Sequence, residues 1–209
     1  MSPSGDYHEA LWEGVPEGSE PPDLDLRCAF LLEHVQAGER VLDVGCGEGR
    51  FAAELARIGA HPVGIDIAAE PLRRARAIHP ELDLRQVRAA GAWPLKDASF
   101  DAVWAGEVIE HVADTAGWLS EVRRVLRSGG SLLLSTPAHG RLQMLWWALA
   151  PRAFEAHFDP RADHLRFYRS RTLTELLEDF GFHDVEVRSV GGPPGARRAL
   201  LASARRSRF

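Results

Sequence analysis

Cysteine is scarce in this sequence: only Cys28 and Cys46 stand among its 209 residues. Two cysteines are too few to staple a fold of this length through disulfides. Cys46 also lies within a glycine-rich segment, where a disulfide would obstruct the close approach of a ligand. We therefore expect a protein of the reduced, cytoplasmic environment.

The sequence also lacks a long apolar run and an excess of positive charge. Residues 142–150 are the longest stretch worth considering for a membrane, and they are far too short for a span. The N-terminus has no basic region followed by an apolar run, so we expect no secretory signal. The net charge of −5, from 25 basic and 30 acidic side chains, gives no overall attraction to nucleic acid.

The composition is that of one ordinary globular domain. Hydrophobic residues make up 45% and charged residues 26% of a chain short enough for a single core. Residues 1–23 are rich in proline, glycine and acids, and we expect a mobile arm there, in which Tyr7 and Trp12 are exceptions. Residues 24–209 then form the folded domain.

Strand and helix patterns alternate along most of this domain. Short apolar runs predict strands at residues 40–44, 61–67, 84–87, 100–105 and 131–136. Helical spacing predicts helices at residues 24–35, 51–58, 69–78, 118–126 and 173–180. Residues 185–190 and 199–204, on either side of a turn-rich segment at 191–195, predict a final antiparallel pair. Such an order is typical of an open α/β sheet whose ligand lies beyond the carboxyl ends of the strands.

Three glycines, Gly45, Gly47 and Gly49, directly follow the first strand. Glycine has no Cβ atom and tolerates a positive φ, so a ligand can lie directly on the backbone of this loop. The dinucleotide fingerprint needs a further glycine where this chain has Arg50, which weakens the alternative of a nicotinamide-dependent oxidoreductase. Asp43, at the strand end, suits a ligand with an ammonium group and would repel a pyrophosphate.

A second carboxylate, Asp66, ends the next strand. At this place a carboxylate can accept hydrogen bonds from both hydroxyls of a ribose. A glycine-rich turn on its own can be merely a tight connection between a strand and a helix. Together with Asp43, Asp66 and the alternating elements, it favours a site for a nucleoside with a cationic tail and no phosphate.

Several segments resemble the motifs of a known family. VLDVGCGEG at residues 41–49 is similar to the first motif of class I S-adenosylmethionine-dependent methyltransferases, and VGIDI at residues 63–67 is similar to the second. Later motifs of the small-molecule subgroup, which includes the ubiquinone-biosynthesis O-methyltransferases, resemble SFDAV at 99–103, EVIEHV at 107–112 and LRSGG at 126–130. The similarity spans about residues 38–137 and extends more weakly to Phe182.

The resemblance implies a fold, a cofactor and a binding site. The fold is an α/β, Rossmann-like sheet of seven mostly parallel strands with helices on both faces and an antiparallel last strand. The cofactor is S-adenosylmethionine; the role of the N-terminal arm is left open by the resemblance, although Tyr7 and Trp12 could fold over a bound donor. The residues that we expect to bind it are Asp43, Gly45, Cys46, Gly47, Gly49, Asp66, Ile67, Ala90 and Glu107.

One position departs from the family pattern. Family members often place an aspartate after the third strand to bind the amino group of adenine, whereas this chain has Ala89 there. We expect adenine to be recognised instead by backbone groups and by apolar contact from Ala90 or Trp93.

Two histidines are candidate catalytic residues. Methyl transfer from a sulfonium depends mostly on positioning, and a base is needed only where the acceptor must lose a proton. His111, after the fourth strand, and His139, after the fifth, could take that proton near neutral pH. His111 could equally be a helix-entry histidine bonded to the backbone.

Residues 138–169 lie where this family inserts its substrate cover. The Leu- and Trp-rich part at 141–154 predicts an amphipathic helix, and packing on the sheet is the simplest interpretation. The alternatives are a lid over an apolar acceptor, or a peripheral membrane contact with Arg141 and Arg152 at its ends. The basic C-terminal residues Arg197, Arg198, Arg205, Arg206 and Arg208 fit the membrane alternative, although such charges are usually solvated.

We expect no metal site. A polar loop gathers His157, Asp159, Asp163 and His164, but this spacing does not specify the convergent oxygens that a hard cation needs. The function that we expect is methyl transfer to a small, partly apolar molecule, with oxygen as the favoured atom. The alternative is a non-catalytic or membrane-peripheral module that keeps the fold. The sequence does not specify the oligomeric state.

Overall fold

The computed structural model describes residues 3–159, 163–193 and 196–207. Three parts of the segments discussed above lie outside the described residues. They are Arg208 of the basic C-terminus, residues 194–195 of the turn-rich segment, and residues 160–162 of the expected substrate cover.

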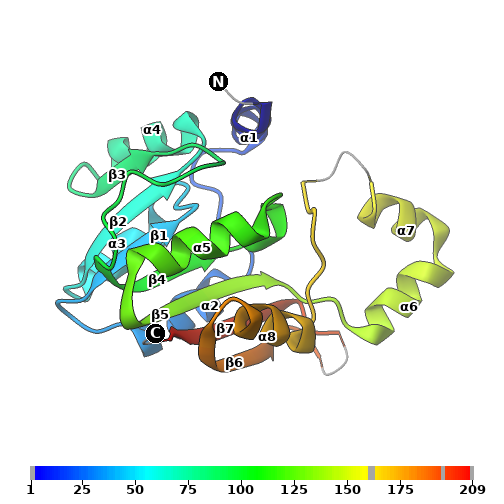
Figure 1. The fold of residues 1–209 in the computed structure, drawn as a ribbon. Helices are drawn as coiled ribbons and strands as arrows, with labels where there is room; N and C mark the ends of the chain where they lie inside the picture. The colour runs from blue at the N-terminus through cyan, green and yellow to red at the C-terminus, as the bar shows by residue number, and fades with distance from the viewer. Residues whose placement is uncertain (1–2, 160–162, 194–195, 208–209) are drawn as a thin grey trace.

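A seven-stranded sheet in the order β3-β2-β1-β4-β5-β7-β6 forms the centre of the molecule (Figure 1). The first five strands pair in parallel, and β7 runs antiparallel to both β5 and β6. This arrangement confirms the expected Rossmann-like fold with an antiparallel last strand. The strands are β1 (Arg40–Val44), β2 (His61–Asp66), β3 (Asp83–Gln86), β4 (Phe100–Gly106), β5 (Leu126–Pro137), β6 (Phe182–Val190) and β7 (Ala199–Arg206).

Helices cover both faces of the sheet. Side chains of α2 (Leu24–His34) and α3 (Arg50–Arg57) pack around Trp104 on one face. Side chains of α5 (Thr115–Val125) and α8 (Ser170–Asp179) pack around Val103 on the other. Because neighbouring residues of a strand point to opposite faces, Val103 and Trp104 of β4 belong to different cores. Helix α4 (Ala69–Ile78) packs on Leu84 of β3 and tolerates Pro71 in its first turn.

The parallel strands end together at one edge of the sheet. β1, β2 and β4 pair in register, so that Val44 lies beside Ile65 and Ala105 near their carboxyl ends. The loops that follow these strands therefore meet, and the short 3-10 helix η1 (Ile109–His111) lies among them after β4. This edge is where an open α/β sheet binds its ligand.

The N-terminal segment contains a helix that the sequence did not predict. α1 (Pro3–Gly14) lies next to α4 and the carboxyl edge of the sheet (Figure 1). Polar contacts with α4 and with the glycine loop fix its place, and a pattern of apolar residues does not reveal such contacts. The mobility expected for residues 1–23 stays a prediction.

The apolar segment after β5 forms two helices, α6 (Arg141–Leu149) and α7 (Pro151–His157). Neither helix has a buried residue, and both project beyond the sheet (Figure 1). The simplest interpretation, a helix packed on the sheet, is therefore wrong. Apolar side chains occur on several sides of α6, and Leu142 and Leu149 are 65% and 75% exposed. In the part of the chain that the structure describes, no helix is long and apolar enough to cross a membrane.

Candidate active site

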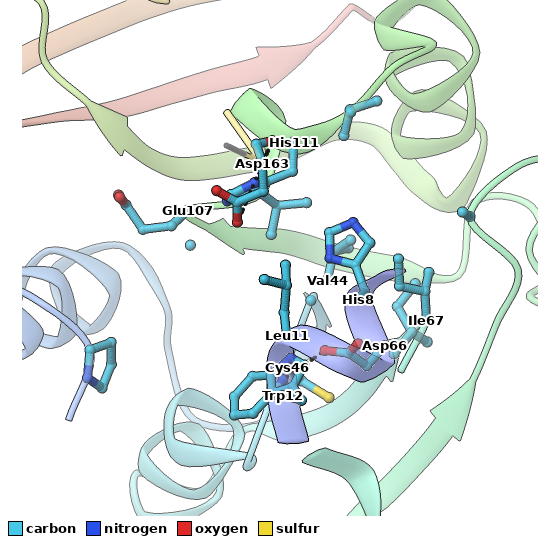
Figure 2. Close-up of a pocket in the computed structure, with 18 of the residues that line it drawn as sticks. His8, Leu11, Trp12, Val44, Cys46, Asp66, Ile67, Glu107, His111 and Asp163 are labelled. Atoms are coloured by element: carbon cyan, nitrogen blue, oxygen red, sulfur yellow. Dashed lines mark hydrogen bonds and ion pairs between the residues drawn. The ribbon is translucent and has the colours of Figure 1, made fainter. Parts of the chain in front are cut away.

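A cavity of about 1480 Å³ opens at the carboxyl ends of β1, β2 and β4 (Figure 2). Its walls come from the glycine loop, from the loops after β2, β3 and β4, and from residues 163–165. Side chains of α1 line it opposite the sheet. The topology thus brings together segments that are far apart in the sequence.

The glycine loop takes a path that only small residues allow. Gly45 and Gly47 have φ values of 68° and 52°, in the left-handed region that favours glycine. A Cβ atom on Gly45 would lie 2.6 Å from a methyl carbon of Val108, and one on Gly47 would lie 3.2 Å from the Trp12 ring. Both glycines line the cavity, as expected. Gly49 is absent from the cavity lining and precedes α3, where an added Cβ atom would meet Leu82 and Ala75, and its expected contact with the donor stays a prediction.

Asp66 lines the cavity at the end of β2. Its carboxylate accepts hydrogen bonds of 2.9 Å from the backbone N–H groups of Gly47 and Ala68. Burial raises the pKa of this carboxyl group, while those hydrogen bonds act in the opposite direction. Asp66 is thereby fixed beside the loop, and its expected contact with a ribose stays a prediction.

Asp43 lies beneath the loop and outside the cavity lining. It is only 1% exposed and accepts a backbone hydrogen bond from Ala52 of α3. Burial, reinforced by the nearby negative charge of Asp66, raises the pKa of Asp43 to about 8. Asp43 thus supports the loop from below, and its expected contact with an ammonium group stays a prediction.

The Cys46 side chain also points away from the cavity, although its backbone lines it. The thiol packs with Leu72, Ala75 and Leu84 between α4 and β3. The backbone N–H groups of Gly45 and Cys46 both donate to the carbonyl oxygen of Ile65. The part of Cys46 that a donor could contact is therefore its backbone.

We call the part of the cavity beside the glycine loop and Asp66 the donor half, because we expect the donor there. Its far end has apolar side chains next to Arg88. Ile67, Ala90 and Trp93 line it, and Trp93 is almost fully buried. Ala89 lines the same region with no polar side chain to offer. The predicted reliance of adenine on backbone groups and apolar contacts is compatible with this wall.

Glu107 lies between the donor half and the opposite end of the cavity. Its φ of 56° is unusual for a residue other than glycine. The hydroxyl group of Ser135 donates a 2.9 Å hydrogen bond to the Glu107 carboxylate, and the Glu107 N–H donates to the Ser135 carbonyl oxygen. The strand end thus holds Glu107 facing the cavity.

His111 lines the end of the cavity opposite the donor half. Its Nδ1 lies 3.0 Å from the carbonyl oxygen of Asp163 and 3.3 Å from a carboxylate oxygen of the same residue. Burial lowers the pKa of His111, partly offset by the charge of Asp163. A neutral imidazole that donates through Nδ1 can accept a proton at Nε2, which lies 3.9 Å from a carboxylate oxygen of Glu110.

His139 lies outside the cavity lining and is only 4% exposed. Its ring packs with those of Trp147, His157 and Phe167, at centroid distances of 6.1, 5.5 and 5.0 Å. We call His139, Trp147, His157, Phe158 and Phe167 the aromatic cluster. The structure thus supports a packing role for His139, and its catalytic role stays a prediction without a place in the cavity.

The polar residues that the sequence places between His157 and His164 lie in different surroundings. His157 joins the aromatic cluster, whereas Asp163 and His164 line the cavity. Ligand atoms of Glu110, His111 and His164 all lie within 4.8 Å of one another. This trio could hold a divalent cation, and the expectation of no metal site stays a prediction.

Arg27 is a cavity residue that the sequence analysis missed. It is 2% exposed, and its guanidinium group donates to the Pro22 carbonyl oxygen. Its Nε atom has no hydrogen-bond partner among the described residues. Arg27 shares a helix face with Leu24 and Leu31, so a cation on an apolar face was the available signal.

Comparison with known proteins decides the family. A family model described as a methyltransferase domain matches residues 21–187. The chain belongs to this methyltransferase domain family. It is 33% identical over 206 residues to the ubiquinone biosynthesis O-methyltransferase of Xylella fastidiosa, covering 93% of this chain and 82% of that protein.

Two further methyltransferases extend this comparison. The chain is 38% identical over 157 residues to a probable S-adenosylmethionine-dependent methyltransferase of Mycolicibacterium smegmatis, which covers 72% of this chain. It spans only 54% of the length of that relative. An S-adenosylmethionine-dependent methyltransferase from Mesorhizobium loti shares the fold, with a TM-score of 0.65, 24% identity and coverage of 85% of this chain and 96% of that one. The predicted methyltransferase family and its cofactor class are confirmed.

Proposed function

We propose that this methyltransferase domain transfers the methyl group of S-adenosylmethionine to an oxygen atom of a small, partly apolar molecule. The observation that carries the proposal is the cavity that joins the glycine loop and Asp66 to His111. Its volume exceeds the range of about 300–1,000 Å³ that is usual for one small ligand. The cavity therefore has room for donor and acceptor together.

The donor half has a candidate partner for the ribose, the sulfonium end, the carboxylate and the adenine of the donor. Asp66 meets the ribose hydroxyls, and the backbone of Gly45 and Gly47 lets the sulfonium end approach closely. Arg27 suits the donor carboxylate, because a buried guanidinium with an unpartnered N–H gains a charged hydrogen bond there. Ala90 and Trp93 offer apolar contact to adenine.

At the acceptor end, His111 is our choice for the base. An acceptor hydroxyl gives its proton to Nε2 while its oxygen attacks the methyl carbon, and the electron pair of the broken C–S bond returns to sulfur. Asp163 fixes the ring through Nδ1. Oxygen as the methylated atom is supported by the name of the Xylella relative.

Binding of the donor product S-adenosylhomocysteine, measured by calorimetry, tests the donor half. We expect wild type to bind and Asp66→Ala to bind about a hundredfold more weakly, since two charge-assisted hydrogen bonds are lost. Asp83→Ala is the matched control, because Asp83 starts the neighbouring strand and pairs with Arg85 at the surface. No binding by wild type would overturn the donor assignment.

Incubation with a labelled donor and fractionated cell extract would name the acceptor. With that acceptor at saturation, we expect His111→Gln to lower the turnover rate by about 10²–10⁴-fold, the usual contribution of a general base. If His111→Gln leaves the turnover rate at the wild-type value across pH 6 to 9, His111 is excluded as the base. Tight donor binding without transfer to any fraction would favour the non-catalytic alternative.

We also propose that α6 and α7 contact a membrane surface peripherally. The supporting observation is the exposure of Leu142, Leu145, Trp146 and Leu149 on a projecting helix, with Arg141 at its start. Sedimentation with anionic phospholipid vesicles tests this proposal. We expect Leu149→Ser to reduce binding several-fold, and the control Ile78→Ser, at an exposed apolar residue of α4, to leave it unchanged.

A further inference from the structure

Helix α1 forms the wall of the donor half that faces the glycine loop. His8, Leu11 and Trp12 line the cavity, and Figure 2 shows them on the side of Cys46 and Asp66. The Trp12 ring lies against Gly47, as the 3.2 Å distance to an added Cβ atom shows. A donor that lies along the glycine loop and contacts Asp66 is therefore covered by α1.

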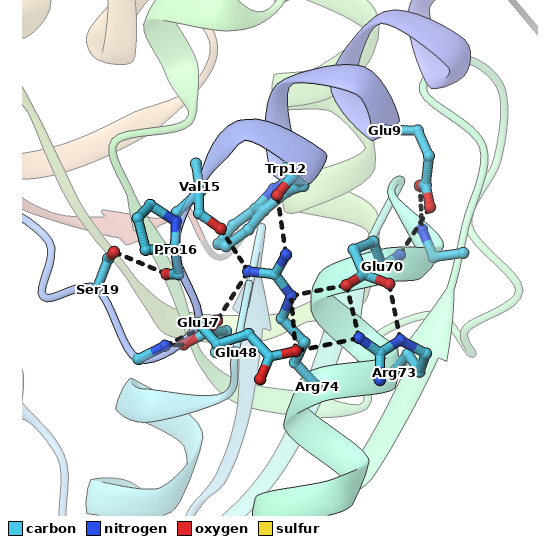
Figure 3. Close-up of polar contacts among 12 residues, drawn as sticks. Glu9, Trp12, Val15, Pro16, Glu17, Ser19, Glu48, Glu70, Arg73 and Arg74 are labelled. Carbon is cyan, nitrogen blue, oxygen red and sulfur yellow. Dashed lines mark hydrogen bonds and ion pairs between the residues drawn. The ribbon is translucent and has the colours of Figure 1, made fainter.

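The attachment of α1 is polar. None of its described side chains, from Tyr7 onward, is buried. A helix of 12 residues is marginal on its own in water, so its place depends on what it contacts. Those contacts reach α4 and the glycine loop, and Figure 3 shows them together.

The first contact is at the start of α4. The carboxylate of Glu9 accepts hydrogen bonds from the N–H groups of Ala69 and Glu70, at 2.7 and 2.9 Å. Ala68, which precedes α4, has no side chain able to cap those groups. Glu9 thus supplies the missing cap from another helix and also complements the positive end of the helix dipole.

The second contact is made by Arg74 of α4, which is only 7% exposed. Its guanidinium group donates to the carbonyl oxygens of Trp12 and Val15, at 3.1 and 2.8 Å, where α1 ends. A 2.8 Å bond to Glu70 orients the same group from α4. The carbonyl groups at the end of α1 thereby find the donors that a helix terminus lacks.

The third contact joins the segment after α1 to the glycine loop. Glu48, within that loop, lies 3.4 Å from Arg74 and accepts a 3.2 Å hydrogen bond from the Gly18 N–H. Arg50, directly after the loop, donates a 2.6 Å hydrogen bond to the Gly18 carbonyl oxygen. The segment that follows α1 is thus held by residues on both sides of Gly49.

We propose that α1 is a lid over the donor, and that Arg74 and Glu48 are positioning residues that couple its closure to the glycine loop. The inference rests on the donor binding proposed above. A donor lying on the loop completes the contacts of Leu11 and Trp12, and must wait for α1 to detach before it leaves. Lid opening therefore limits donor release.

Release of S-adenosylhomocysteine, followed by stopped-flow displacement in the full chain, tests the lid. We expect Arg74→Ala to release the product about tenfold faster with a similar loss of affinity, since several hydrogen bonds from one charged group are lost. Arg74→Lys should restore part of the difference. Arg57→Ala is the control, because Arg57 pairs with Glu54 at the surface of α3 and should leave the rate within twofold.

A second variant separates lid closure from folding, because Arg74 is buried. Glu9→Gln keeps the size of an accessible side chain, and we expect release about threefold faster at an unchanged melting temperature. Amide hydrogen exchange of residues 7–18 should slow when the product binds to wild type, and slow less in Glu9→Gln. Protection that is equal with and without product would overturn the lid.

The outcomes distinguish the two proposals. If wild type fails to bind the product, the donor assignment itself is wrong. If wild type binds, and Arg74→Ala and Glu9→Gln release the product at the wild-type rate, the donor assignment stands and the lid is wrong.

Discussion

The helices at the two ends of the cavity are attached to the domain in opposite ways. α1, at the donor end, is held by charged side chains that bond to backbone groups, above all Glu9 and Arg74. α6 and α7, beyond the acceptor end, are held by the aromatic cluster, in which Trp147 stacks on His157 at a centroid distance of 3.5 Å. Neither α1 nor α6 has a buried residue among those described.

The difference fits the two ligands that we propose. Directional hydrogen bonds to backbone groups define one closed position, which suits a charged donor that must be held in one geometry. The packing of rings needs no charged partner, and the acceptor that we propose is partly apolar. The outward side of α6 is apolar as well, with Leu145 and Trp146 more than half exposed.

Among the changes that test this difference in attachment, removal of the stacked tryptophan should have the largest energetic effect. We expect Trp147→Ala to lower the free energy of local opening of α6 and α7 by about 2 kcal/mol, below the usual 3–5 kcal/mol because Trp147 is only partly buried. Amide hydrogen exchange of residues 141–157 measures this change. Trp146→Ala is the matched control, since Trp146 is 59% exposed. Equal effects of the two variants would mean that the aromatic cluster does not hold these helices.

A smaller effect should come from crowding the lid. We expect Gly47→Ala to weaken binding of S-adenosylhomocysteine about tenfold, because the new Cβ atom meets Trp12 and the φ of 52° is strained for alanine. Gly38→Ala carries similar strain, at a φ of 83°, with no atom within 4 Å of the new Cβ. Calorimetry should find that Gly38→Ala binds S-adenosylhomocysteine with the wild-type affinity. An equal loss of affinity in both variants would assign the weaker binding of Gly47→Ala to backbone strain alone.

The smallest effect should be a pH dependence confined to the aromatic cluster. Burial lowers the pKa of His157 and His139 below the ordinary 6.5, and the charge of His164 acts in the same direction on both. The stability that they contribute is therefore full above pH 6.5 and is lost as the pH falls through the lowered values. Protection factors of α7 amides should fall between pH 7 and 5 in wild type and fall less in His157→Phe. An identical fall in both proteins would contradict this assignment.

The sequence predicted well those features that depend on neighbouring residues. The parallel strands, the glycine loop and the position of Asp66 follow from periodicity and spacing along short segments. The length of a strand was harder to predict. β5 begins at Leu126 and continues through Gly129 and Gly130, because Leu126 pairs with Phe100 of β4 across an irregular register. That pairing is not visible in the β5 segment alone.

Features that depend on distant contacts were missed. Arg74 looks like a surface residue in the sequence, and it is buried only because Trp12, Val15 and Glu48 surround it. His139 was placed correctly after β5, but whether it turned toward the cavity depended on Trp147 and the residues that follow it. Periodicity reports which face of an element is apolar, and it does not report which distant segment covers that face.

Cys46 gives the glycine loop a sulfur atom that should be chemically inert. A Cβ atom on Gly64 would lie 2.9 Å from its Sγ atom, so the space around the thiol is filled. Burial also raises the pKa of this thiol far above its ordinary value, which keeps it protonated and poorly nucleophilic. Alkylating reagents and peroxides act on exposed thiolates. The loop should therefore keep its shape under oxidative stress, despite carrying one of the two cysteines of the chain.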